Sequence, residues 1–144
     1  MRIVLCAVTL TAGLLLSSSA HAQWADLGNG LPGTTTPVLV GVGPLLPTAN
    51  TKIEVSTALP DSSLFLIVGL TNLSAPFKGG VLVPFPDLLL SFPTDGAGHW
   101  QVIFSWPNMP AGFKLWWQAW QLDPNGPAGF AATNALESTA WVDC

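Results

Sequence analysis

Few side chains in this sequence are suited to catalysis. His99 follows Asp95 by four residues, and this pair is the best placed to act as a general base or a metal ligand. A catalytic triad or a metal site needs further groups that converge in space, but the chain after residue 22 has no second histidine. The run Asp95-Gly96-Ala97-Gly98 is typical of a turn. We therefore expect His99 to flank a turn at the start of a strand.

The acidic residues do not form a catalytic pattern either. A glycosidase needs two carboxylates facing each other across a cleft, and the eight acids are scattered singly along the chain. Asp123-Pro124-Asn125-Gly126 resembles the start of a calcium loop, but its proline and the missing downstream carboxylate favour a type I turn. Gly79-Gly80 lacks the ending of a phosphate-binding loop and predicts a tight turn or bulge before Val81. We expect no catalytic residue, no cofactor and no metal.

The seven tryptophans are the residues best suited to binding. Indole rings held on a rigid sheet can stack on the apolar face of a sugar, so Trp116, Trp117 and Trp120 are a candidate ligand platform. Gln118 and Gln121 would then be hydrogen-bonding neighbours. The alternatives are that these rings form core, where large aromatics bury much area, or a subunit contact. In a strand, Trp116 and Trp117 must point to opposite faces.

The N-terminus predicts export. Met1-Arg2 is followed by the apolar run Ile3–Leu16 and by Ala20-His21-Ala22, which is the pattern of a signal peptide with a small-residue cleavage site. The run is too short to span a bilayer, which needs about 20 residues. We therefore assign residues 1–22 to a signal peptide and expect a secreted protein: extracellular, on the cell surface or in the periplasm.

Composition after residue 22 excludes several classes of partner. Three lysines and no arginine stand against eight acids, for a formal charge of −5. A surface that neutralises phosphates is very hard to build from these residues, so we expect no nucleic-acid partner and no polybasic membrane patch. No later apolar stretch is long enough to insert into a membrane. Cys144 is the only cysteine left, so stability must come from packing rather than from a disulfide.

The spacing of apolar residues predicts the elements that carry these side chains. From Pro37 onward, short apolar runs alternate with Pro, Gly, Asn and Asp about every ten residues, which is typical of an all-β protein. Residues 52–56 alternate as a half-exposed strand does, and Leu64–Leu70 is continuously apolar, as in a central strand covered on both sides. Trp100, Val102 and Phe104 share one face of a further strand. An α-helix is an alternative prediction to a strand only for residues 131–138.

These patterns together predict a single antiparallel β-sandwich of about seven or eight strands, Ig-like or jelly-roll-like. We assign it to residues 37–144. Residues 23–36, rich in Gly and Thr, are predicted to be a lead-in segment.

Several short motifs resemble an uncharacterised secreted β-sandwich domain of planctomycete and myxobacteria-like extracellular proteins. They are Trp24–Gly28 (WADLG), Pro76–Pro84 (PFKGGVLVP), Trp106-Pro107, Gln118-Ala119-Trp120 and Gly129–Leu136 (GFAATNAL). The family often has serine at the position of Thr133 and an aromatic other than tryptophan near Trp116. The resemblance implies an exported bacterial β-sandwich, and it supplies no catalytic residues.

The sequence thus favours a non-catalytic structural or interaction domain of the cell envelope or extracellular space. Its expected partners are a polysaccharide or another envelope protein. The first alternative is a carbohydrate-binding module that uses exposed tryptophans. The second is a small secreted hydrolase built from His99 and the scattered acids.

Overall fold

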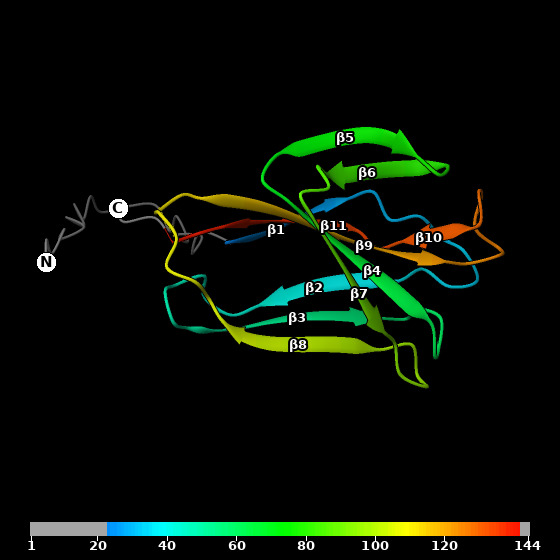
Figure 1. Ribbon diagram of the computed structural model, residues 1–144, viewed down its shortest axis with the longest axis horizontal. Helices are drawn as coiled ribbons and strands as arrows, with labels where there is room; N and C mark the ends of the chain where they lie inside the picture. Colours follow the sequence, from blue (N-terminus) through cyan, green and yellow to red (C-terminus); the bar gives the residue numbers. More distant parts are fainter. Residues whose placement is uncertain (1–22, 142–144) are drawn as a thin grey trace, which may run out of the picture.

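The computed structural model describes residues 23–141, which form eleven strands, every paired strand antiparallel to its neighbour (Figure 1). The predicted signal peptide and Cys144 lie outside the described residues. The described part of the chain contains no helix long and apolar enough to cross a lipid bilayer. The strands are β1 (Trp24–Gly28), β2 (Val38–Val42), β3 (Asn50–Ser56), β4 (Ser63–Gly69), β5 (Asn72–Phe77), β6 (Gly80–Pro84), β7 (Leu88–Pro93), β8 (Trp100–Ser105), β9 (Lys114–Leu122), β10 (Phe130–Ala132) and β11 (Ala135–Thr139).

The strands are arranged in three layers (Figure 1). The larger sheet has the order β1-β11-β9-β4-β7, with β10 also paired to β9. The smaller sheet, β2-β3-β8, covers one face of it, and the β5–β6 hairpin covers part of the other face. The all-β sandwich predicted from the sequence is therefore confirmed.

The expected number of strands, seven or eight, is too low. Part of the difference lies in residues 23–36, which we had expected to be a lead-in segment. Trp24–Gly28 is an edge strand of the larger sheet and pairs with β11, from Trp24 opposite Ser138 to Gly28 opposite Ala135. The boundary at residue 36 therefore does not separate this segment from the sandwich. The stretch 131–138, where helix competed, is divided between β10 and β11.

Alternating side chains fill the space between the two sheets. Leu64, Leu66 and Val68 of β4 point toward the smaller sheet, where they pack with Ile53 and Val55 of β3. The intervening residue Ile67 lies in a second cluster, beneath the hairpin. The prediction that Leu64–Leu70 contains a central strand covered on both sides is thus confirmed, except that Leu70 lies beyond the strand and is exposed.

The hairpin is closed by the turn expected at Gly79-Gly80. Phe77 pairs with Gly80 across a two-residue turn, in which Lys78 has φ = 49° and Gly79 has φ = 82°. Two consecutive positive φ values define a type I′ turn, whose twist matches that of the flanking strands. The turn directs β6 back across the larger sheet, where Leu82 packs in the same cluster as Trp120.

The two long sides of the sandwich are closed differently. On the β1/β2 side, the Asn134 amide joins the sheets: its Oδ1 accepts from Leu39 N at 2.9 Å and its Nδ2 donates to Leu39 O at 3.0 Å. The Trp24 ring covers Gly41 so closely that a Cβ there would lie 2.3 Å from it. On the opposite side, among the described strands, β7 pairs only with β4 and β8 only with β3. This second side is where the candidate site lies.

Candidate functional site

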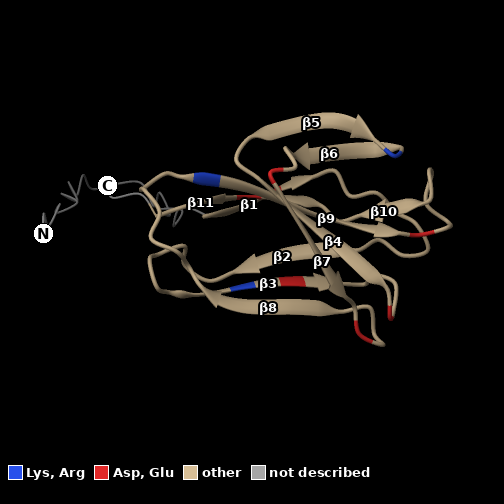
Figure 2. Cartoon of the chain, in the orientation of Figure 1, with Lys and Arg blue, Asp and Glu red and all other residues tan. Residues whose placement is uncertain are grey.

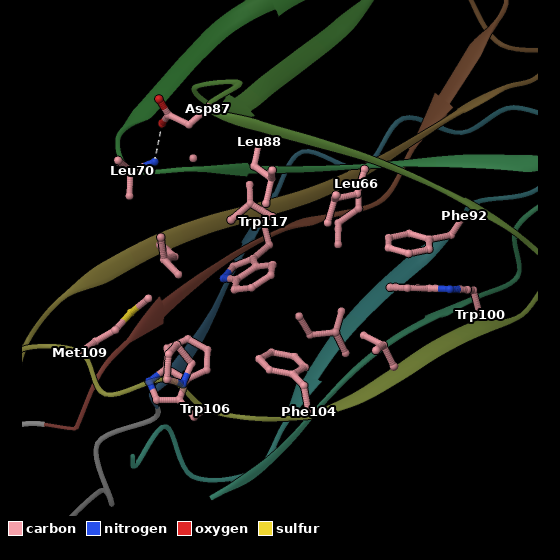
Figure 3. Close-up of a pocket in the computed structure, with 17 residues that line it drawn as sticks. Leu66, Leu70, Asp87, Leu88, Phe92, Trp100, Phe104, Trp106, Met109 and Trp117 are labelled. Carbon is pink, nitrogen blue, oxygen red and sulfur yellow. Dashed lines mark hydrogen bonds between the residues drawn. The ribbon is translucent and has the colours of Figure 1, made fainter. Parts of the chain in front are cut away.

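An apolar cleft separates the free edge strands β7 and β8 (Figure 3). In β7, Leu88, Leu90 and Phe92 are paired with the inward-facing Val68, Leu66 and Leu64 of β4, so they too point between the sheets. The facing wall is the inner side of β8, formed by Trp100, Val102 and Phe104. All six side chains line the cleft, and none of them is fully buried.

One end of the cleft is closed and the other is open. At the closed end, the rings of Phe92 and Trp100 are stacked, with centroids 4.5 Å apart and planes 25° apart (Figure 3). At the other end of β7, Leu88 is 48% exposed although it points between the sheets, so the cleft opens to solvent there. Trp106, Met109 and Trp117 also line the cleft, which has a volume of about 510 Å³.

The lining limits the chemistry that the cleft can perform. Asp87 is the only charged side chain among the lining residues, and it is exposed at the β7 end. Its Oδ2 accepts a hydrogen bond from Leu70 N at 2.7 Å, which fixes the carboxylate beside the opening. The indole of Trp117 donates to Ser138 Oγ at 2.8 Å and so makes its hydrogen bond within the protein. Such walls suit an apolar group and offer little to the hydroxyls of a sugar.

The predicted tryptophan platform does not lie on the surface. Trp117 is 7% exposed and belongs to the core between the sheets, whereas Trp120 is 2% exposed and lies on the other face, beneath the hairpin. Trp116 is half-buried on that same outer face of β9, and its Nε1 is buried without a hydrogen-bond partner. The expectation that Trp116 and Trp117 point to opposite faces is confirmed. An exposed platform of these rings is not formed, because the hairpin covers the face on which it would lie.

Gln118, which we had expected beside a ligand, connects the hairpin to the larger sheet instead. It is fully buried, and its Oε1 accepts from Val83 N at 3.0 Å. Its Nε2 donates to Val81 O at 3.1 Å and to Thr133 O at 3.2 Å. Gln121 makes an equivalent pair of bonds, since its Oε1 accepts from Leu59 N and its Nε2 donates to Leu59 O. Both amides therefore act as structural links.

His99 lies among charged groups outside the cleft. Its backbone N–H donates to Asp95 Oδ1 at 2.9 Å, as expected for a residue flanking a turn, and its Nε2 lies 2.9 Å from Glu54 Oε1. Lys52 Nζ lies 2.8 Å from Glu54 Oε2. The hydrogen bond from Lys52, followed by that from His99, lowers the pKa of Glu54. Within residues 23–141, no group of three potential ligands is placed to hold a metal ion.

The segment at Asp123 is a turn, as predicted. Gly126 N donates to Asp123 O at 2.9 Å, which closes four residues. The Asp123 carboxylate is buried, and it accepts bonds from Thr34 N at 2.7 Å, Thr34 Oγ1 at 2.8 Å and Asn125 N at 3.0 Å. Burial raises the pKa of Asp123, but the bonds from Asn125 and Thr34 outweigh it, so the pKa is lowered. Both oxygens of this carboxylate thus already accept hydrogen bonds from within the chain.

Sequence reasoning missed the cleft, although part of its signal was present. The sequence predicts that Trp100, Val102 and Phe104 share one face of a strand, and Leu88, Leu90 and Phe92 show the same spacing. Periodicity shows which residues share a face. It does not show that both strands lie at open edges opposite each other.

Comparisons with known proteins identify no relative: no family model, no curated protein and no solved structure matches the chain. The resemblance to the secreted domain of planctomycete and myxobacteria-like proteins stays a prediction.

Proposed function

We propose that this chain is an exported, non-catalytic interaction domain that holds the apolar part of another molecule in the cleft between β7 and β8. The observation that carries the proposal is the incomplete burial of the inward faces of these two strands. Leu88, Leu90 and Phe92 face Trp100, Val102 and Phe104, yet apart from the stacked rings of Phe92 and Trp100 the walls leave a cleft between them. Export is expected from the N-terminal pattern in residues 1–22.

The favourable part of the binding free energy of an occupant depends on the apolar area of the cleft that it would cover. Removing apolar surface from water stabilises a complex by about 25 cal/mol per Å².

Sandwich proteins usually protect their edge strands by covering, charging or shortening them. Among residues 23–141, the β1/β2 side is closed by Trp24 and Asn134, whereas the β7/β8 side is left open. A cleft of about 510 Å³ lies within the usual range for small-molecule sites.

The position of the titratable groups supports a non-catalytic role. General acid–base catalysis requires a group within hydrogen-bond reach of the reacting atoms. His99 and Glu54 do not line the cleft, and they are hydrogen-bonded to each other. Asp87 is the one acid that does line it, and it accepts a bond from the backbone of Leu70.

The proposal is tested with N-phenyl-1-naphthylamine, an uncharged probe whose fluorescence rises in apolar surroundings. We expect saturable binding to the purified protein. Val102→Trp places a large ring inside the cleft and should weaken binding at least tenfold, because the added atoms occupy the ligand's space. Ile103→Trp is the matched control: it lies next in β8, but its side chain points outward and is exposed. This variant should bind as the unaltered protein does.

A second pair of variants makes the same test from the other wall. Leu90→Trp should block the cleft, whereas Leu89→Trp, on the exposed face of β7, should not. Each variant is first checked for cooperative thermal unfolding. Unchanged probe binding in folded Val102→Trp and Leu90→Trp would refute the proposal, as would the absence of any binding to the unaltered protein.

A further inference from the structure

We infer that the cleft takes a single hydrocarbon chain, and that Asp87 at its opening favours amphiphiles with a cationic or uncharged head over those with an anionic head. The inference rests on the proposed function and adds the class of ligand to it. It is carried by two independent features of the cleft, which are its elongated apolar shape and the sign of the charge at its opening.

The cleft has the dimensions of an extended chain. Its walls run along β7 and β8, and the four residue steps from Leu88 to Phe92 correspond to roughly 13 Å of strand. The stacked rings of Phe92 and Trp100 close the inner end. A methylene group takes up about as much space as a water molecule, roughly 30 Å³, so about 510 Å³ accommodates a chain of a dodecyl type.

The charges of the described chain disfavour an anionic head at this opening. Asp87 is exposed, and its carboxylate is held beside the opening by the bond from Leu70 N. The three lysines lie in β3, in β9 and in the β5–β6 turn (Figure 2), and none of them is among the residues that line the cleft. Lys52 is paired with Glu54 and Lys114 with Glu137.

Lys78, the third lysine, also lies away from the opening of the cleft. Lys78 lies in the hairpin turn, where its Nζ is 5.4 Å from the centroid of the Phe130 ring. A carboxylate or sulfate head would therefore meet a fixed negative charge with no cationic side chain of the described residues beside it. A trimethylammonium head would be attracted. Exposed charge pairs of this kind change affinity by up to roughly fivefold.

A polypeptide strand fits the cleft less well than a hydrocarbon chain does. Each residue of a strand brings one N–H and one C=O group, and burial without a partner is unfavourable for both. The free edges of β7 and β8 offer backbone partners only along the rims. The walls consist mostly of side chains such as Leu90, Val102 and Phe104, which offer none, and the Nε1 of Trp106 is a single unpartnered donor.

The test compares amphiphiles that share a dodecyl chain and differ in the head group. Dodecyltrimethylammonium, dodecyl maltoside and tridecanoate, whose carboxylate carries a dodecyl chain, are each used below their micelle concentrations to displace the naphthylamine probe. We expect the cationic amphiphile to displace it at the lowest concentration and tridecanoate at the highest, with the extremes differing by up to roughly fivefold at low salt. High salt should reduce this difference, because the attraction is exposed to solvent.

Asp87→Asn should remove the preference without removing binding. Asp61→Asn is the matched control, since it makes the same charge change at an exposed acid that does not line the cleft. It should keep most of the preference.

The possible failures are distinguishable. Equal displacement by all three amphiphiles would refute the role of Asp87 and leave the proposed function standing. Binding of the probe with no displacement by any amphiphile would refute the hydrocarbon ligand. Displacement only by an apolar strand-forming peptide would replace the hydrocarbon with a protein partner. Absence of probe binding would refute the proposed function itself.

Discussion

Replacing Gln118 with methionine tests whether this residue is a structural link rather than a ligand contact. Methionine has a similar length to glutamine but is apolar, so the substitution removes the hydrogen bonds while keeping most of the packing. Gln118 is fully buried between the larger sheet and the hairpin. The substitution would leave Val83 N–H buried without its partner at 3.0 Å.

The expected loss of stability follows from the bonds that are removed. An orphaned buried donor costs about 1–3 kcal/mol, and each further lost bond contributes about 1 kcal/mol. Gln118 also donates to Val81 O and Thr133 O. The free energy of unfolding should therefore fall by roughly 3–5 kcal/mol. For a domain of this size, that corresponds to a decrease in Tm of about 10–20 °C.

Thermal unfolding followed by circular dichroism measures this loss. Gln101→Met is the matched control, because Gln101 is exposed on the outer face of β8. Its Tm should change by only a few degrees, as is usual at the surface. A loss below about 1 kcal/mol in Gln118→Met would show that the hairpin is not held by this amide. Probe binding in the cleft should persist in the folded fraction, since Gln118 lies on the opposite face of β9.

Three further substitutions test how the sandwich is held together. Asn134→Ala removes the two hydrogen bonds to the backbone of β2 and should lower the unfolding free energy by about 2 kcal/mol in urea titrations; no change would show that packing alone closes that side. Asp123→Asn should cost about 2 kcal/mol at neutral pH. Because hydrogen bonding lowers the pKa of Asp123 in the fold, its contribution is present above the unfolded pKa near 3.8 and is lost as pH falls through the folded value. The two proteins should therefore converge in stability at low pH, and a difference that persists there would contradict this account. Gly98→Ala should cost at least about 2 kcal/mol, because Gly98 has φ = 70° and a Cβ would lie 1.9 Å from Ala58 O. Gly96→Ala, where nothing lies within 4 Å, should be nearly neutral in the same thermal scans.

The fold class was predictable because it depends on local patterns. The alternation of residues 52–56 and the uninterrupted run Leu64–Leu70 each indicate how a strand is buried. Lys78-Gly79-Gly80 supplies a turn whose φ values are positive at the first two positions. Each of these features is encoded within a few neighbouring residues.

The site was not predictable because it depends on contacts between distant segments. β9 pairs with β4, about 50 residues earlier, and the β5–β6 hairpin then covers Trp120 and Gln118. A strand pattern alone cannot show which outer face receives a hairpin. For the same reason the sequence could not show that β7 and β8 would face each other as open edges.

The tryptophans provide the most direct test of the cleft, because their indole N–H signals report on different parts of the molecule. Trp100, Trp106 and Trp117 line the cleft, whereas Trp120 lies beneath the hairpin. We would follow these signals by ¹⁵N NMR while titrating the purified protein with dodecyltrimethylammonium below its micelle concentration. The account predicts saturable shifts that are largest for the three cleft indoles, with little change for Trp120. Shifts centred on Trp120, or on the exposed Trp141 without the cleft signals, would place binding elsewhere and contradict the account.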